Sequence, residues 1–166
     1  MRGYLLDTNI VAYWLDEGRP QHQRVAQHIQ ELPPGAPLMI SAITLGEIEY
    51  GLHVVSEDST AWQEAFRELV DRRLPMVLDI SKTTCMYYGS LRARLFEKYT
   101  PRQRRRRGLR PEQLIDPVTS RELGIQENDL WLAAQALEFN LVLATNDALE
   151  HIRDVCEELQ IENWAG

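Results

Sequence analysis

Five short runs of apolar residues recur along the chain, and polar or turn-forming residues bound each of them. They cover residues 3–7, 37–41, 76–80, 141–145 and 161–165. Runs of this length predict β-strands. Several are apolar throughout, without the alternation of a half-exposed strand, which indicates strands buried on both faces of a sheet.

Between these runs, apolar residues repeat every three or four positions, which predicts helices with one face turned to a core. Phe66 and Val70, for example, fall on the same face of such a helix. The expected helices cover residues 9–18, 20–32, 42–52, 59–73, 82–99, 128–140 and 146–159. Strands that alternate with helices are typical of an α/β fold. We therefore predict a single domain over residues 1–166, with a central, mostly parallel five-stranded sheet that helices flank on both faces.

The composition changes this picture little. Apolar residues make up 44% and charged residues 26% of the 166 positions, as in ordinary globular domains. No apolar run approaches the roughly 20 residues that span a bilayer, and the start of the chain lacks a signal-peptide pattern. Cys85 and Cys156 stand apart and form no CxxC motif. We expect two buried, reduced thiols in a cytoplasmic protein with no membrane contact, not a disulfide or a zinc site.

Charge is distributed unevenly along the chain. The formal net charge is −7, yet residues 97–123 hold eight basic and four acidic side chains, which makes this segment +4 and the rest −11. Prolines and glycines break the segment, so it does not predict a long helix. Its arginines of interest are Arg102, Arg104, Arg105, Arg106, Arg107 and Arg110. An acidic body with one basic segment suggests two separate electrostatic tasks.

Four acidic residues fall where predicted strands end and the next helices begin. Asp7 ends the first strand, and Asp147 follows the fourth. Glu47 lies in the expected first turn of the helix after the second strand, and Asp129 opens the helix at 128–140. In an open parallel sheet these junctions lie along one edge, where ligands bind. The sequence therefore predicts that the four acids meet at that edge.

Each acid also has a plainer explanation as a helix cap. Asp7 and the Asn–Asp pairs at 128–129 and 146–147 stand where caps are favoured, and "TLGE" at 44–47 matches a capping box. Taken singly, each acid fits a cap better than a ligand. The junctions are doubled, however, since "DTN", "ND" and "TND" each combine a cap with a spare acid. Carboxylates suit Mg²⁺ or Mn²⁺, and no histidine or cysteine cluster competes for a softer metal.

Four blocks cover nearly the whole chain: "LLDTNI" (5–10), "SAITLGEIEYG" (41–51), "NDLWLAAQA" (128–136) and "LATNDALEHI" (143–152). In this order they resemble the PIN-domain nucleases, and most closely the VapC-type ribonuclease toxins of prokaryotic toxin–antitoxin pairs. Each block alone is weakly specific, whereas the four together are strong. The resemblance implies a PIN-like domain whose first strand is central. It also implies an RNA substrate, a cognate antitoxin as partner, and a homodimer.

The resemblance also implies a site. A metal-dependent phosphodiesterase centre would be formed by Asp7, Glu47, Asp129 and Asp147, with Thr8, Asn9, Thr145 and Asn146 in supporting positions. The chain departs from compact members of this family at about 99–123, where an Arg-rich insertion replaces a short linker. The arginine run at 102–108 fits a solvated loop, a clamp for RNA phosphates, or a docking surface for an acidic segment of an antitoxin or second subunit.

The expected chemistry is that of Mg²⁺ or Mn²⁺ held by carboxylates, which activates water and relieves charge on a phosphate. This predicts an endoribonuclease, the toxin of a type II pair. The alternatives are a non-toxin PIN-type RNA-processing nuclease and a catalytically silent RNA-binding PIN domain. A magnesium-dependent phosphatase or a DNA nuclease is a further rival. The phosphatase would more often carry a DxD pattern after the first strand, and "DTN" lacks it.

Overall fold

The computed structural model describes residues 2–54, 60–74, 76–100 and 109–166, with the exception of the side chains of Trp62 and Arg73. Five strands form one sheet, in the order β3-β2-β1-β4-β5, and every pairing is parallel. The strands are β1 (Tyr4–Leu6), β2 (Leu38–Ser41), β3 (Met76–Leu78), β4 (Val142–Thr145) and β5 (Gln160–Asn163). The predicted five-stranded sheet is confirmed, and β1 lies at its centre.

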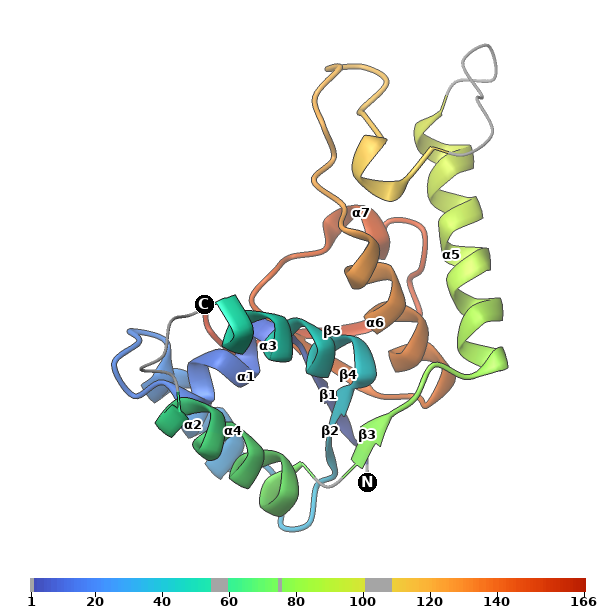
Figure 1. The fold of residues 1–166 in the computed structure, drawn as a ribbon. Coiled ribbons are helices and arrows are strands. Elements are labelled where there is room, and N and C mark those ends of the chain that lie inside the picture. The colour runs from blue at the N-terminus through green and yellow to red at the C-terminus, as the bar shows by residue number, and fades with distance from the viewer. Residues whose placement is uncertain (1, 55–59, 75, 101–108) are drawn as a thin grey trace.

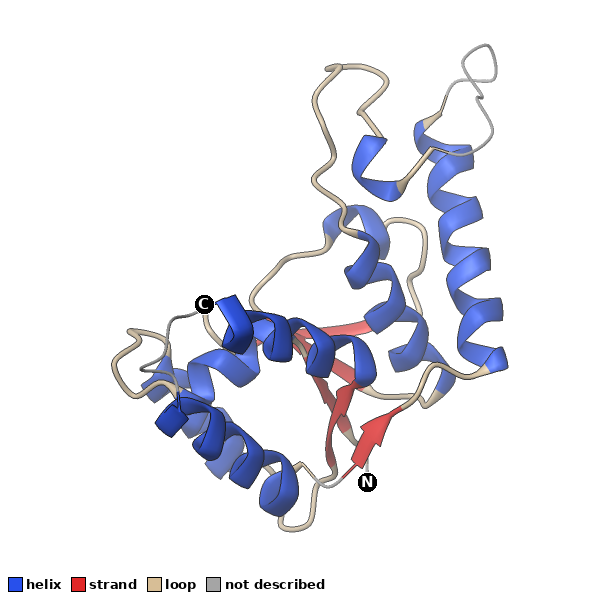
Figure 2. Ribbon diagram, in the orientation of Figure 1, coloured by secondary structure: helices blue, strands red, loops and turns tan. Residues whose placement is uncertain are grey.

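The helices match the predicted pattern in number and order within the described ranges (Figures 1 and 2). They are α1 (Thr8–Leu15), α2 (His22–Glu31), α3 (Ala42–Val54), α4 (Thr60–Arg73), α5 (Lys82–Tyr99), α6 (Glu127–Glu138) and α7 (Glu150–Arg153). A 3-10 turn, η3 (Pro111–Gln113), stands between α5 and α6. None of the described helices is long and apolar enough to cross a membrane.

Neighbouring residues of the central strand serve opposite faces of the sheet. Leu5 faces the layer of α5, α6 and α7, whereas Leu6 faces the layer of α1 to α4. The register repeats this division across the sheet, because Leu5 pairs with Met39 and Leu143, while Leu6 pairs with Ile40 and Ala144. Both faces are therefore buried, which explains the continuously apolar strands. Figure 1 shows the two helix layers on either side of the sheet.

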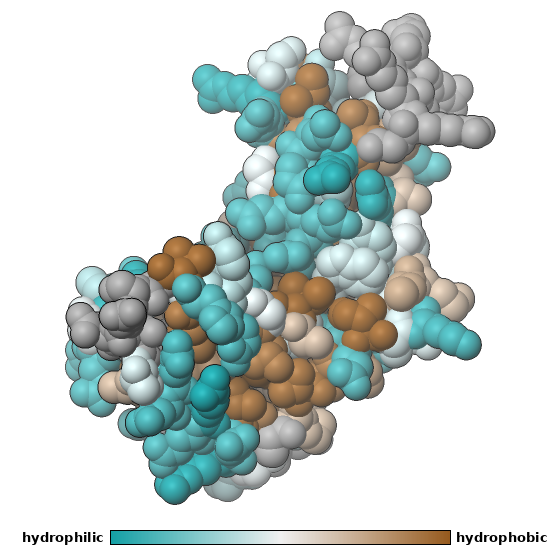
Figure 3. Space-filling model, viewed as in Figure 1, coloured by the Kyte–Doolittle hydropathy of each residue, from teal (hydrophilic) through white to brown (hydrophobic). Residues whose placement is uncertain are grey.

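The surface near α4 and α3 has a hydrophilic part and a hydrophobic part. Figure 3 shows a hydrophilic outer surface on α4 and hydrophobic side chains gathered beside it, below α3.

Cys156 is buried as predicted, but Cys85 is exposed, so the prediction of two buried thiols is wrong for Cys85. In this turn of α5 the buried residue is Thr84. Cys85 is the next residue along the helix and therefore lies outside the buried face.

Two helix predictions near the acidic residues need correction. The helix after β2 begins at Ala42, as the range 42–52 predicts, but the capping box read at "TLGE" is wrong, because the Ser41 hydroxyl accepts the N–H of Ile43 at 3.0 Å and caps the helix instead. Glu47 consequently lies in the second turn of α3 and has no capping role. The helix predicted over 146–159 contracts to the single turn α7. Leu149 has a φ of 46°, a left-handed conformation that a continuing helix cannot contain.

The segment between α5 and α6 is folded onto α5 in the part that the structure describes, residues 109–126. Leu114 and Ile125 are buried in the core cluster that α5 and α6 share. An isolated antiparallel bridge between Ile115 and Glu122 closes a loop between them. The arginines at 102 and 104–107 lie outside the described residues, so the predicted Arg-rich insertion at about 99–123 stays a prediction in that part.

Candidate metal centre at the sheet edge

The acidic residues gather where the central strand β1 and its neighbour β4 end. Asp7 directly follows β1, and its N–H donates to the carbonyl of Ala144 in β4 at 3.0 Å. Asp147 comes two residues after the end of β4. Because β1 and β4 are parallel neighbours, their carboxyl ends open onto the same edge of the sheet. The other two acids reach this edge from α3 and α6.

Asp7 is the most enclosed of the four, with a relative exposure of 7%. One carboxylate oxygen accepts the N–H of Thr8 at 2.6 Å, which caps α1, and the other accepts the Thr145 hydroxyl at 2.8 Å. Burial raises the pKa of Asp7; these two hydrogen bonds oppose the rise, and the charges of Asp147 and Glu47 add to it. Asp7 is thus both a cap and a buried acid among other acids.

Glu47 is held by donors from two other helices. Its Oε2 accepts a short hydrogen bond from the Thr8 hydroxyl at the start of α1. Its Oε1 accepts from the side-chain amide of Asn128, at the start of α6, at 2.6 Å. The first of these bonds places Glu47 next to Asp7, since Thr8 contacts both carboxylates through different groups. The second links Glu47 to the residue directly before Asp129.

Asp129 lies in the first turn of α6. Its carboxylate accepts the N–H of Gln126 at 3.3 Å, a long hydrogen bond. Burial and then the charge of Asp7 raise the pKa of Asp129 to about 7, and Asp147 and Glu47 contribute further. A carboxyl group that served only as a cap would be stabilised in its ionised form. The opposite shift here reflects burial and the crowding of acids.

Asp147 differs from the other three because it is exposed. Its N–H donates to the Thr145 hydroxyl at 3.1 Å, so Thr145 connects it to Asp7. Asp147 and Asp129 both line a cavity of about 270 Å³, together with Gln126, His151 and neighbouring residues. The cavity leads solvent to two of the four acids.

The predicted supporting residues have different roles. Thr8 and Thr145 hold carboxylates, as described above. Asn9 is exposed on the first turn of α1, and Asn146 uses its backbone carbonyl to accept the side-chain amide of Asn163 at 3.3 Å. Asn128, for which the sequence indicates only a cap, binds Glu47. The doubled "ND" pair is the signal that could have identified it.

The basic residues can be placed only in part. Arg110 has an exposed side chain, and its N–H donates to the Gln113 side chain at 2.8 Å. This bond belongs to the η3 turn, not to the acidic edge. Arg102 and Arg104 to Arg107 fall outside the described residues, so their proposed RNA or partner contacts stay a prediction.

The donor chemistry at this edge fits a hard divalent cation. Carboxylates are the ligands that Mg²⁺ and Mn²⁺ prefer, and a cation would stabilise the ionised form of Asp129, whose pKa is raised. Among the described side chains, however, no three acids, histidines or cysteines are already arranged around one point as a ligand set. Each carboxylate oxygen has a second lone pair beyond the bonds described above. Direct and water-mediated binding of an ion would therefore leave those bonds in place.

Comparison with known proteins finds similar chains over nearly the full length. Ribonuclease VapC1 of Haemophilus influenzae (strain R2866) is 29% identical over 163 residues, which is 97% of each chain. Ribonuclease VapC2 of Rickettsia felis is 27% identical over 161 residues, again 97% of each chain. Among solved structures, VapBC2 from Rickettsia felis bound to a DNA fragment from their promoter matches with a TM-score of 0.69 and 27% identity, covering 97% of this chain and 98% of that one.

The match extends to a family model. The PIN domain model aligns with residues 4–157, a range that contains β1 to β4 and all four acids and ends shortly before β5. The order of the strands, with β1 at the centre, agrees with the resemblance that the four sequence blocks carry. This chain belongs to the PIN domain family.

Proposed function

We propose that this protein is a metal-dependent endoribonuclease and the toxin of a type II toxin–antitoxin pair. The observation that carries the proposal is the group of four carboxylates at the sheet edge, in which burial and the charges of the other three acids raise the pKa of Asp129 to about 7. Acids are crowded in this way where a site is built to receive a cation. Similarity over nearly the full length to proteins named Ribonuclease VapC supports RNA as the substrate.

The side chains divide the work. Asp7, Glu47 and Asp129 would hold Mg²⁺ or Mn²⁺, directly or through water, and Asp147 would orient the attacking water or hold a second ion. Thr8, Thr145 and Asn128 fix the carboxylates by hydrogen bonds. The bound ion supplies activation of water and relief of charge on the phosphate. Without a cation the carboxylates would repel a phosphodiester, so RNA binding would depend on the metal.

Partners follow from the same relationship. Several of the similar structures are named as VapBC, and we infer a cognate antitoxin for this chain. Exposed apolar side chains such as Tyr50 and Met86, at 71% and 74% relative exposure, offer surface for an antitoxin or for a second copy in a homodimer. The basic segment, including Arg110, would bind RNA phosphates or an acidic antitoxin segment. A cytoplasmic location goes with a role on cellular RNA and stays a prediction.

The experiment is cleavage by purified protein freed of any antitoxin. Structured RNA, DNA of the same sequence and a small phosphate ester are each incubated with Mn²⁺ and with EDTA. We expect cleavage of RNA alone, abolished in EDTA. RNA binding without cleavage would favour the silent RNA-binding domain, and preference for DNA or the ester would favour the other rivals. Growth arrest on expression, relieved by a small neighbouring gene, distinguishes a toxin from an RNA-processing nuclease.

A further inference from the structure

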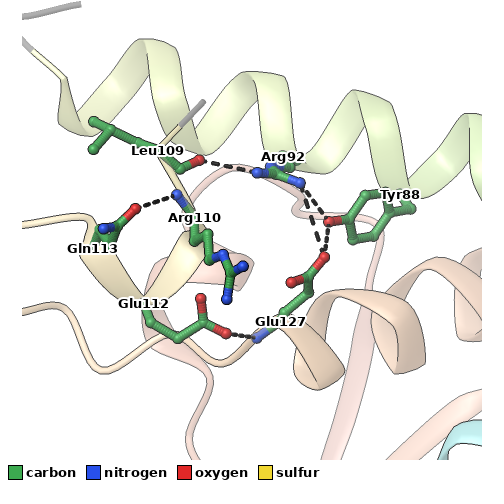
Figure 4. A network of polar contacts seen from close by, with 7 residues as sticks. All are labelled: Tyr88, Arg92, Leu109, Arg110, Glu112, Gln113 and Glu127. Carbon is green, nitrogen blue, oxygen red and sulfur yellow. Dashed lines mark hydrogen bonds and ion pairs between the residues drawn. The ribbon is translucent and has the colours of Figure 1, made fainter. Parts of the chain in front are cut away.

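A chain of polar contacts connects α5 to the first residue of α6 through the segment after residue 108 (Figure 4). At its centre, the carboxylate of Glu127 accepts the Tyr88 hydroxyl at 2.6 Å. Arg92, one turn further along α5, donates to the same hydroxyl at 2.8 Å and lies 3.9 Å from the Glu127 carboxylate. Tyr88 and Arg92 therefore hold the start of α6 from its side.

The segment between the helices closes the chain of contacts. The second branch of the Arg92 guanidinium donates to the carbonyl of Leu109 at 3.0 Å. From the same segment, the Glu112 carboxylate accepts the backbone N–H of Glu127 at 2.8 Å. That N–H is one of the first four of α6, which no helical carbonyl can satisfy. Glu112 thus caps α6 from 15 residues away in the sequence.

Packing makes the arrangement rigid. The Tyr88 ring stacks on Trp131 of α6 with 3.8 Å between ring centroids and 8° between the planes. Tyr88 is 9% exposed. Its burial, followed by its hydrogen bond to Glu127, raises the pKa of the hydroxyl, which consequently keeps the proton that it donates. Ring and hydroxyl together fix both the distance and the rotation of the first two turns of α6 relative to α5.

These contacts end one residue before the acidic site. Asn128, which binds Glu47, and Asp129 directly follow Glu127. Within the described part of the chain, the hydrogen bonds of Tyr88, Arg92 and Glu112 reach none of the four acids. We propose that these three are positioning residues, which hold the first turn of α6 so that Asn128 and Asp129 face Asp7 and Glu47. The insertion is then part of the active-site frame as well as a carrier of positive charge.

The inference rests on the proposed function, but one of its tests does not depend on catalysis. Tyr88→Phe removes the hydroxyl and keeps the ring that stacks on Trp131. Tyr87→Phe is the matched control, because Tyr87 is the exposed neighbour on the same helix. For a short RNA, we expect kcat to fall on the order of tenfold in Tyr88→Phe with KM unchanged within about twofold, since only the geometry of the reacting groups is disturbed.

The second readout is binding of Mn²⁺ alone, measured by calorimetry. The Kd should rise roughly three- to tenfold in Tyr88→Phe and stay unchanged in Tyr87→Phe, because supporting contacts tune the affinity of metal ligands. A variant that merely lowered the stability of the fold would leave the Kd of the folded protein unchanged. The absence of RNA cleavage by wild type would count against the proposed function, and the Mn²⁺ comparison would still test the positioning role.

Glu112 allows a test by rescue. Glu112→Ala removes the acceptor for the Glu127 N–H, whereas Glu112→Gln keeps an oxygen in the same place. Glu122→Ala, also in the insertion and exposed, controls for the loss of charge. We expect a lower kcat and weaker Mn²⁺ binding in Glu112→Ala, recovery in Glu112→Gln, and wild-type values in Glu122→Ala. Wild-type Mn²⁺ affinity in both Tyr88→Phe and Glu112→Ala would overturn the inference, as would equal losses in all three glutamate variants.

Discussion

The chain contains two Asn–Asp pairs at the same sheet edge, and the structure uses them differently. In the pair at 128–129, both side chains belong to the acidic group: Asn128 binds Glu47, and Asp129 has a pKa of about 7. In the pair at 146–147, the contacts are made by the backbone, through the Asn146 carbonyl and the Asp147 N–H. Asp147 is left exposed beside the cavity.

The difference follows from what comes after each pair. Residues 127–138 form a three-turn helix whose buried face packs on α5, so the first pair is fixed by tertiary contacts. The second pair forms a bend just before the single turn α7. A dipeptide therefore acquires a rigid chemical role only where the helix behind it is anchored. The two pairs should respond differently to the same substitutions.

The largest expected difference is in turnover. Asp129→Asn, like Asp7→Asn, should reduce metal-dependent RNA cleavage by on the order of a hundredfold or more, because a charged ligand is removed from an enclosed group. Asp147→Asn should cost less, roughly tenfold, because the exposed Asp147 is not one of the three proposed principal ligands. Single-turnover cleavage at saturating Mn²⁺ measures all three, with circular dichroism as the check on folding. Full activity in Asp7→Asn or Asp129→Asn would remove these residues from the site.

The two asparagines should differ by less. Asn128→Ala frees one oxygen of Glu47 and should lower turnover about tenfold, the usual scale for a residue that supports a metal ligand. Asn146→Ala leaves its backbone contact intact and should stay within about twofold of wild type, since only side-chain atoms are removed. The same cleavage assay compares them. Equal losses would mean that the two pairs contribute alike, contrary to the structure.

The smallest effect on chemistry should come from the basic segment. Replacing Arg104 to Arg107 with Gln should leave turnover of a very short RNA nearly unchanged. Binding of a longer RNA should weaken, and the slope of log K against log salt should fall by about 0.7 for each phosphate that the protein no longer neutralises. Filter binding at several salt concentrations measures the slope. An unaltered slope would leave the solvated loop or a protein partner as the explanation of the run.

The fold could be predicted from the sequence because each strand and helix is determined by the pattern of apolar residues within its own segment. Continuous apolar runs such as 141–145, which are short and bounded by polar residues, predict strands buried on both faces, and parallel strands then require the helices between them. This also placed Asp7 and Asp147 at one edge. Which residue caps a helix was harder to predict. "TLGE" fits a capping box locally, yet Ser41 caps α3 one turn earlier.

The hydrogen bonds that support the acids could not be predicted from the sequence, because they join residues that are distant in the chain. Asn128 binds a residue 81 positions away, and Glu112 binds the N–H of Glu127, 15 residues further along the chain. Such pairs depend on how α3, α5 and α6 pack, and no periodicity reports that. Cys85 shows the same limit, since a helical residue at the border of the buried face has no pattern to decide its exposure. The roles of the four acids themselves stay a prediction.

The crowding of acids predicts the direction in which the stability of the metal-free protein changes with pH. The pKa of Asp129 is about 7 in the folded chain and about 3.9 in an unfolded one. Between these values the folded state holds a proton that the unfolded state has released, so the metal-free wild type loses stability as pH rises from about 4 to 7. Above pH 7 the whole penalty is present. Asp129→Asn removes this penalty and should raise the free energy of unfolding by roughly 2 kcal/mol once solvent screening is allowed for.

Thermal unfolding of wild type and Asp129→Asn at about pH 7.5, in EDTA and in Mn²⁺, tests the metal site most directly, because the penalty at Asp129 is then fully present. We expect that in EDTA the variant melts several degrees above wild type. We also expect Mn²⁺ to raise the melting temperature of wild type by mass action and that of the variant much less. If the variant melts at or below wild type in EDTA and Mn²⁺ shifts both equally, Asp129 is a helix cap and the edge is not a metal site.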